Sequence, residues 1–210
     1  MTQIILHDYF RSSASYRVRI ALNLKGIAYD RVEVSLIAGE QRSDAYLEQN
    51  AQGFVPMLVA DGEPIIQSLA IIDWLDRAFP QPRLIPDDPM PRAVALAQAH
   101  VVACDIHPLN NLRVLKYLTR DLGLNEQTKD RWIHAWILQG FDALESMAGD
   151  GPFLGGAAPG IADCCLVPQI YNARRFDVPL DHYPRLIAID AACAELDAVR
   201  RAHPDAVKAA

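Results

Sequence analysis

Three serines lie close together where a short apolar run gives way to a helical pattern. Ser12, Ser13 and Ser15 follow the apolar residues 4–6 and precede apolar residues at helical spacing. Serine favours the N-cap, and the first turn of a helix offers unpaired N–H groups and a partial positive charge. That environment stabilises a thiolate or a carboxylate. Because residues 10–22 lack cysteine, a thiol activated there would belong to a ligand, although an ordinary capped helix gives the same pattern.

Two further junctions in the first 80 residues could also contact a ligand. Gln67-Ser68 lies between a predicted strand and a predicted helix, with Ser68 as the expected N-cap, and that helix start could hold a carboxylate. Val55-Pro56 opens another predicted strand, and composition favours a trans proline at the entry of an edge strand. The alternatives are a cap with nothing bound and an ordinary strand entry.

The elements around these junctions form a small α/β pattern. Asp61-Gly62 lies between two apolar runs, which is typical of a hairpin. The order β-α-β-α-β-β-α matches a thioredoxin-like arrangement with a mixed sheet. We predict strands over 3–6, 29–34, 55–60 and 65–66, and helices over 15–25, 41–48 and 68–78.

A proline-rich stretch follows, and the remainder of the chain has a helical pattern. Prolines at positions 80, 82, 86, 89 and 91 disfavour regular structure, so we divide the chain into a domain over 1–80, a linker over 81–90 and an all-α bundle over 91–210. Pro108 should kink the first long helix, and the alanine-rich tail after His203 should fray. The predicted helices cover 91–121, 126–148, 161–173 and 185–201.

Polar residues in the predicted bundle have both structural and functional explanations. Asp105 and His107 resemble a pair of metal ligands, but no further ligands are suitably spaced, so we predict no metal site. A lone histidine beside a kink, such as His107, is more often a hydrogen-bonded structural residue, although a cluster of polar side chains at a kink also suggests a face that lines a cleft. Arg174 and Arg175 end a predicted helix, where cations interact favourably with the helix dipole.

Composition excludes several classes of function. The net charge of −6 argues against non-specific nucleic-acid binding. The sequence has no signal-peptide pattern and no apolar run long enough to span a membrane. Cys104, Cys164, Cys165 and Cys193 lack metal or disulfide spacing, so we expect reduced, buried thiols in a cytoplasmic protein.

Taken together, the three junctions resemble the glutathione-contacting points of the glutathione transferase family. Residues 12–22 read SSASYRVRIAL and resemble the zeta-class signature SSCxWRVRIAL, and the resemblance runs along nearly the whole chain. It implies a glutathione-binding first domain, a substrate-binding second domain and a homodimer. The glutathione contacts that it implies are Ser12, Gln52, Val55, Gln67, Ser68, His107 and Asn111.

The zeta-class resemblance also implies an activity, namely glutathione-dependent cis–trans isomerisation of maleylacetoacetate to fumarylacetoacetate. A thiolate would add to the cis double bond, which could then rotate as a single bond. Arg11, Arg113 and Arg175 would bind the substrate carboxylates, with Ser12, Arg11 and Arg175 as catalytic residues. Alternatives are isomerisation of maleylpyruvate, a general detoxifying transferase and a partner protein that has lost catalysis.

Three positions depart from the family pattern. Ala14 replaces the signature cysteine, and Tyr16 replaces the signature tryptophan. We expect the cysteine to be dispensable, because the attacking sulfur would belong to glutathione. Gly160 stands where related transferases carry a serine or threonine cap, so the reciprocal cap with Asp163 should be lost.

Overall fold

The computed structural model describes residues 2–208, which form two compact units. The first unit contains the chain up to Leu84 together with the segment from Ala194 onward, and the second contains Ile85–Cys193. The sequence-based division kept residues 91–210 in one domain, whereas in the structure the segment from Ala194 lies with the first unit. In the described part of the chain no helix is both long and apolar enough to cross a bilayer.

A four-stranded mixed sheet forms the base of the first unit. Its strands are β1 (Ile4–Asp8), β2 (Asp30–Glu33), β3 (Met57–Ala60) and β4 (Glu63–Ile66), in the order β2-β1-β3-β4. β2 is parallel to β1, and β3 is antiparallel to both β1 and β4. This topology confirms the predicted thioredoxin-like arrangement.

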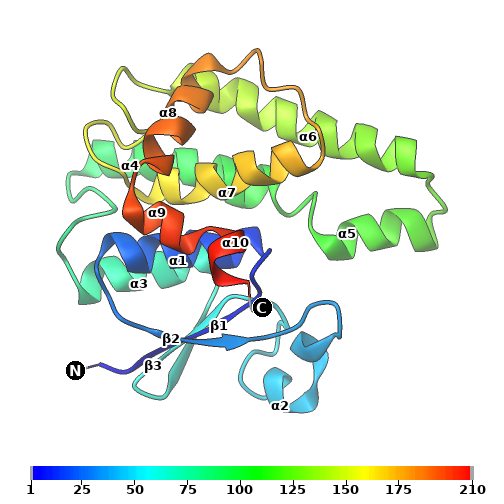
Figure 1. Cartoon of the computed structure of the whole chain (residues 1–210), viewed down its shortest axis with the longest axis horizontal. Helices are drawn as coiled ribbons and strands as arrows, with labels where there is room; N and C mark the ends of the chain where they lie inside the picture. The colour runs from blue at the N-terminus through cyan, green and yellow to red at the C-terminus, as the bar shows by residue number, and fades with distance from the viewer. Residues whose placement is uncertain (1, 209–210) are drawn as a thin grey trace. The chain divides into compact units, whose positions relative to one another are not determined.

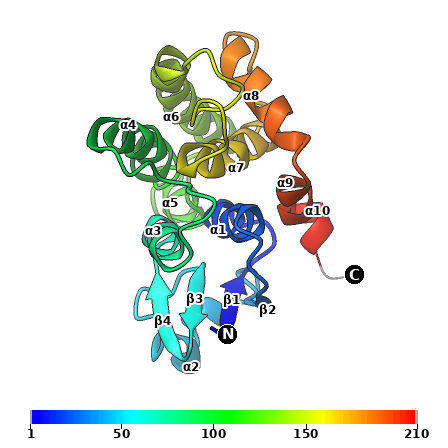
Figure 2. The ribbon, with the colours of Figure 1, turned by 90° about the vertical axis from the view of Figure 1, so that its left-hand side faces the viewer.

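Helices cover both faces of this sheet. Figures 1 and 2 show α1 (Ser13–Leu24) and α3 (Ser68–Ala78) side by side over one face, with α2 (Asp44–Leu47) on the other side. A 3₁₀ turn, η1 (Glu40–Arg42), precedes α2. Ile4, Leu6 and Asp8 of β1 are fully or almost fully buried, while Ile5 and His7 between them are partly exposed. The period of two expected for a strand therefore holds.

The prediction for Pro56 was wrong in two respects. The Val55-Pro56 peptide is cis, and Pro56 enters β3, which has a neighbouring strand on each side. Because Pro56 precedes the first paired residue of β3, Met57, it needs no ladder hydrogen bond. An interior strand can therefore begin directly after this proline.

The end of the chain also differs from the prediction. The expected helix over 185–201 is two helices, α8 (Pro184–Ala194) and α9 (Asp197–Ala202), and the tail after His203 forms a further helical turn, α10 (Pro204–Val207). α9 packs against α1, and the Asn23 side chain donates to the Ala198 carbonyl at 2.9 Å. The tail after His203 is held by Arg31, which donates through Nη1 to the Val207 carbonyl at 2.7 Å, so a segment whose composition alone predicts fraying is ordered over α10.

The second unit is entirely helical, as predicted. Pro108 lies in an irregular turn that separates the segment before it from α5, so the region 91–121, expected to be one long helix or two with a kink at Pro108, is in fact several pieces. Cys104 is exposed, contrary to our expectation, whereas Cys164, Cys165 and Cys193 are buried. The elements of the second unit are α4 (Pro89–His100), the π-helical η2 (Val101–Ile106), α5 (Leu112–Lys116), the π-helical η3 (Tyr117–Asp121), α6 (Glu126–Met147), α7 (Ile161–Arg175) and α8.

Candidate functional site

Ser12 caps the N-terminus of α1. Its extended backbone (φ −68°, ψ 116°) places Oγ 3.2 Å from the Ser15 backbone N–H, which donates to it. The first turn of α1 contains no acidic residue, so none of its side chains neutralises the positive end of the helix dipole. Ser12 is only partly buried, unlike Ser13 and Ser15. The start of α1 can therefore stabilise an external anion.

A tight turn holds Ser12 at the end of β1. The Ser12 N–H donates to the Tyr9 carbonyl at 2.9 Å, and the buried Arg19 donates through Nη2 to the Phe10 carbonyl at 2.9 Å. Arg11 lies in this turn and is exposed, with its guanidinium 5.3 Å from the Phe10 ring and its Nη2 3.3 Å from the Tyr9 hydroxyl. An accessible cation thus precedes Ser12 directly.

The second predicted helix start differs from the expectation in its cap. Gln67, and not Ser68, is the N-cap of α3, and it has a positive φ of 72°. A positive φ is costly for a residue with a side chain, and such strain is often found where a ligand is bound. Gln67 Nε2 donates to Gln52 Oε1 at 2.7 Å, so the structure brings these two predicted residues together as an exposed amide pair.

Ser68 is the first residue of α3, and its hydroxyl has a partner that the sequence did not reveal. The buried Arg17 donates through Nη1 to Ser68 Oγ at 3.2 Å. The Ser68 O–H can still donate, and a charged donor on its oxygen makes it a stronger one. A buried arginine in the middle of a helical signature gives no pattern from which this contact could be predicted.

The loop before Val55 is held rigidly by hydrogen bonds. The Phe54 carbonyl accepts from the Tyr46 hydroxyl and from Asn50 Nδ2, each at 2.7 Å. Gly53 has a φ of 62°, and a Cβ there would lie 2.8 Å from the Gln41 carbonyl oxygen. The Val55 side chain is buried, so a ligand at this position would meet the Val55 backbone.

In the second unit, the predicted residues of the 107–113 segment lie in and after the turn at Pro108. Asn111 is the N-cap of α5, and its Oδ1 accepts from the Arg113 backbone N–H at 3.2 Å. His107 is partly buried and Arg113 is exposed. The Asn111 side chain therefore has a structural role that the sequence did not predict.

The two arginines at the end of α7 have different surroundings. Arg174 forms an ion pair with Asp190 at 2.7 Å. Arg175 is exposed, with its guanidinium 6.0 Å from the Tyr171 ring and 5.5 Å from the Phe176 ring. Aromatic rings can hold a guanidinium without neutralising its charge. Arg175 is therefore the better placed of the two to bind a carboxylate.

The cap of α7 keeps half of the reciprocal arrangement. Gly160 has no side chain to contribute, but Asp163 Oδ2 accepts from the Gly160 N–H at 2.8 Å. The Asp163 carboxylate also accepts from the N–H groups of Leu154 and Gly155. Burial raises the pKa of Asp163, and these backbone hydrogen bonds partly oppose that rise. This is a structural residue of the second unit.

The residues of the first unit fit a small anionic thiol peptide. The starts of α1 and α3 both lack acidic residues in their first turns, and Ser12 and Ser68 add hydroxyl donors there. The Gln52–Gln67 pair offers amide donors and acceptors at the surface. Helix starts suit carboxylates and thiolates, and amides suit peptide groups. This donor set matches glutathione, a tripeptide with two carboxylates and one thiol.

Comparison with known proteins gives the same assignment. The sequence matches the glutathione S-transferase N-terminal domain over residues 6–83 and the C-terminal domain over residues 126–203. A maleylacetoacetate isomerase of Pseudomonas aeruginosa is 48% identical over 202 residues, which cover 95% of each chain.

Solved structures are similar along the whole chain. A holo structure of maleylpyruvate isomerase, described as a bacterial glutathione S-transferase of the zeta class, has a TM-score of 0.94 at 46% identity and covers 96% of this chain and 97% of its own. A maleylacetoacetate isomerase from Anaeromyxobacter dehalogenans with glutathione in its active site has a TM-score of 0.88 at 40% identity, covering 98% and 96%. The chain therefore belongs to the zeta class of the glutathione transferase family.

Proposed function

We propose that this protein is a glutathione-dependent cis–trans isomerase that converts maleylacetoacetate to fumarylacetoacetate. The observation that carries the proposal is Ser12 at the start of α1, partly exposed and without an acidic residue in the first turn. The chemistry that bound glutathione supplies is reversible addition of a thiolate to the double bond, which makes that bond free to rotate. Helix N-termini lower thiol pKa values, so Ser12 and the first turn of α1 would keep that thiol ionised near neutral pH.

The residues that would hold glutathione come from several elements. Ser68 and the start of α3 suit a carboxylate, and the Gln52–Gln67 pair and the Val55 backbone suit peptide groups. His107 and Asn111 complete the proposed set on the strength of the resemblance alone. Fixed contacts of this kind would place the sulfur at Ser12 in every turnover.

Three exposed arginines would bind the substrate carboxylates. Arg11, Arg113 and Arg175 are all accessible in the structure, and the planar guanidinium matches a carboxylate in geometry. Arg11 and Arg175 would also stabilise the negative charge that develops on the substrate. A detoxifying pocket would instead be mainly apolar.

Because Ala14 replaces the signature cysteine, this chain can test whether that cysteine is needed for activity. If the attacking sulfur comes from glutathione, the natural protein with Ala14 is active, and Ala14→Cys changes kcat/KM by less than about threefold, since a threefold change corresponds to less than 1 kcal/mol. Steady-state kinetics of the two proteins measure this change. A natural protein that is inactive but gains turnover in Ala14→Cys would show that the cysteine is required.

Maleylpyruvate is the second candidate substrate. The structural likeness to a maleylpyruvate isomerase, with a TM-score of 0.94, supports it as directly as the sequence identity supports maleylacetoacetate. Both molecules are diketo acids with two carboxylates, so three arginines could serve either one.

The deciding experiment is isomerisation of each substrate with and without glutathione. We expect turnover that requires glutathione, and the ratio of the two kcat/KM values identifies the preferred substrate. Conjugation of an electrophile without isomerisation would instead identify a detoxifying transferase. If the protein catalyses neither isomerisation nor conjugation, the remaining interpretation is a partner protein that has lost catalysis.

We also propose that the protein works as a cytoplasmic homodimer. None of the four cysteines, all of which lie in the described part of the chain, forms a disulfide, which suits a reducing compartment. Met90 and Val94 on α4 are exposed to 73% and 46%, and large apolar side chains of this kind are common at subunit contacts. Sedimentation velocity of the natural protein and of Met90→Asp tests the dimer, because the substitution should shift the distribution toward monomer.

A further inference from the structure

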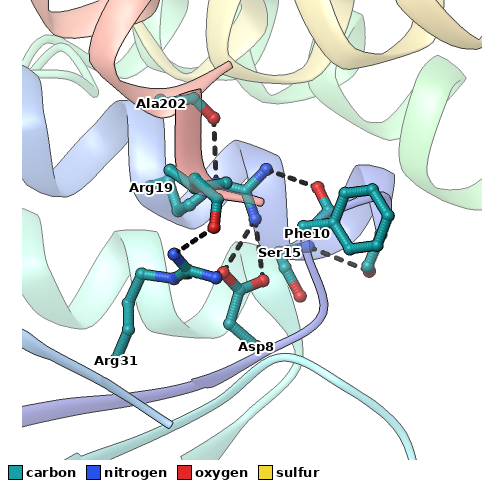
Figure 3. A network of polar contacts seen from close by, with 8 residues as sticks. Asp8, Phe10, Ser15, Arg19, Arg31 and Ala202 are labelled. Atoms are coloured by element: carbon teal, nitrogen blue, oxygen red, sulfur yellow. Dashed lines mark hydrogen bonds and ion pairs between the residues drawn. The ribbon is translucent and has the colours of Figure 1, made fainter. Parts of the chain in front are cut away.

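A buried charge network joins the active-site turn of the first unit to the last helices of the chain (Figure 3). Its centre is Asp8, the last residue of β1, whose carboxylate has no exposed surface. Arg19 donates through Nη1 to both Asp8 oxygens, at 2.7 and 2.8 Å, and Arg31 donates through Nε to Oδ2 at 2.9 Å. One buried carboxylate thus holds two guanidinium groups.

Every nitrogen of the Arg19 guanidinium is used. Nη1 binds Asp8, Nε donates to the Ala202 carbonyl at 2.9 Å, and Nη2 donates to the Phe10 carbonyl at 2.9 Å. The Arg19 side chain is fully buried. Its planar fork therefore fixes four oxygens in one geometry, two from the Asp8 carboxylate and two from backbone carbonyls, which no other residue type can do.

The Phe10 carbonyl is the important acceptor, because it belongs to the peptide group that joins Phe10 to Arg11. That peptide lies in the middle of the turn from Tyr9 to Ser12. Rotation of this peptide plane would move the Arg11 side chain and the Ser12 hydroxyl together. The hydrogen bond from Arg19 to the Phe10 carbonyl opposes that rotation.

We propose that Arg19 is a positioning residue for the isomerase reaction, which fixes the Phe10–Arg11 peptide and thereby orients Ser12 toward the thiol and Arg11 toward the substrate. The proposal rests on the function proposed above. Arg19 is buried and acts only through these two residues. The Ala202 carbonyl at the end of α9 completes its surroundings, so the C-terminal segment takes part in this positioning.

Arg31 provides a matched control. It binds the same Asp8 oxygen and donates through Nη1 to the Val207 carbonyl at 2.7 Å, but it has no hydrogen bond to the turn that carries Ser12. Arg31→Lys therefore weakens the charge network and its link to the C-terminal segment without releasing the Phe10 carbonyl. Arg19→Lys retains a buried cation but cannot reach all three acceptors.

The test compares Arg19→Lys with Arg31→Lys by thermal melting, isomerase kinetics and titration of the thiol of bound glutathione, followed by its ultraviolet absorbance. Both variants should melt at lower temperature. Only Arg19→Lys should lower kcat, by about tenfold, because small displacements of catalytic groups have large effects on rate. Only Arg19→Lys should raise the pKa of the bound thiol, because Ser12 no longer faces it.

Equal effects of the two variants on kcat, or an Arg19→Lys enzyme with the natural kcat and thiol pKa, would overturn the proposal. If Arg19→Lys does not fold, Asp8→Asn carries the test, because it leaves Arg19 in place without its anion. A folded Asp8→Asn variant with the natural thiol pKa would also overturn it. The thiol titration needs only glutathione, so it remains decisive if neither diketo acid is a substrate, which would be the failure of the proposed function itself.

Discussion

Three arginines within nine residues have three different environments. Arg11 is exposed beside the Phe10 ring, Arg17 is buried against the Ser68 hydroxyl, and Arg19 is buried on Asp8. An exposed guanidinium remains free to recruit an anion from solvent. A buried guanidinium is stable only with acceptors around it, so it holds those acceptors in place and does not bind a ligand from solvent. Of the three arginines, only Arg11 is therefore accessible for the substrate-binding role proposed above, whereas Arg17 and Arg19 have internal acceptors.

The first prediction at this scale concerns the cap at Ser12. Ser12→Ala removes the acceptor of the Ser15 N–H and should lower the free energy of unfolding by about 1 kcal/mol. It should also abolish most glutathione-dependent turnover. Asn125→Ala is the control, because Asn125 caps α6 through the Thr128 N–H at 2.9 Å. Chemical denaturation and kinetics should show similar stability losses but an activity loss only at Ser12; equal activity losses would contradict the role of Ser12.

The second prediction concerns His7 of β1, whose ring lies edge-on to Tyr46 at 6.0 Å. Burial lowers the pKa of His7, so the folded state resists protonation. The unfolded chain then binds more protons as the pH falls below about 6.5, the ordinary histidine value. Stability from this group is fully present above that pH and declines as the pH falls toward the folded-state pKa.

His7→Gln should accordingly flatten the decline in melting temperature between about pH 7.5 and pH 5, a range around the ordinary histidine pKa. His182→Gln, at an exposed position, is the control for replacing a histidine. Melting curves at several pH values measure the slope for each protein. An unchanged slope in His7→Gln would show that other groups cause the decline.

At the scale of elements, α6 and η2 approach each other unusually closely in the second unit. Gly140 of α6 faces the side chain of Ile106, the last residue of η2, and a Cβ on Gly140 would clash with it. Ile106 is fully buried and directly precedes His107. The absence of a side chain at position 140 therefore sets where the segment with His107 begins.

Gly140→Ala should destabilise the protein by about 1–3 kcal/mol, because overpacking outweighs the gain in helix propensity. In an Ile106→Ala background the clash is gone, and the same substitution should stabilise the protein by up to about 1 kcal/mol. Denaturation of the four proteins of this cycle gives both values. The same sign in both backgrounds would show that Ile106 is not the neighbour that matters.

Local patterns predicted the elements that depend on local interactions. The helix predicted over 68–78 is α3 with the same bounds, and the helix predicted over 126–148 is α6 to within one residue. The failures depend on distant partners. Gln67, the observed cap of α3, pairs with Gln52, and the ordered turn of α10 is tied to Arg31, so both depend on neighbours remote in sequence. The same holds for Arg17, whose contact with Ser68 spans 51 positions.

At the scale of the whole molecule, the chain leaves the first unit at Leu84 and returns to it at Ala194. The returning segment supplies backbone carbonyls to two arginines of the first unit, Ala202 to Arg19 and Val207 to Arg31. A charge buried on folding needs such acceptors. Arg19 and Arg31 therefore have all these acceptors only when the segment from Ala194 to Val207 is in place.

Ending the chain after His203 tests this dependence, because it removes α10 and the Val207 carbonyl but keeps the Ala202 carbonyl. The free energy of unfolding should fall by about 1.5–3 kcal/mol, the typical contribution of a hydrogen bond to a charged group. If the loss acts through Arg31, the shortened chain and Arg31→Met should not be additive, and the truncation should cost little in the Arg31→Met background. Denaturation of the four proteins measures the coupling. Additive losses would mean that α10 stabilises the first unit by packing alone, and the arginine would then have no part in holding the end of the chain.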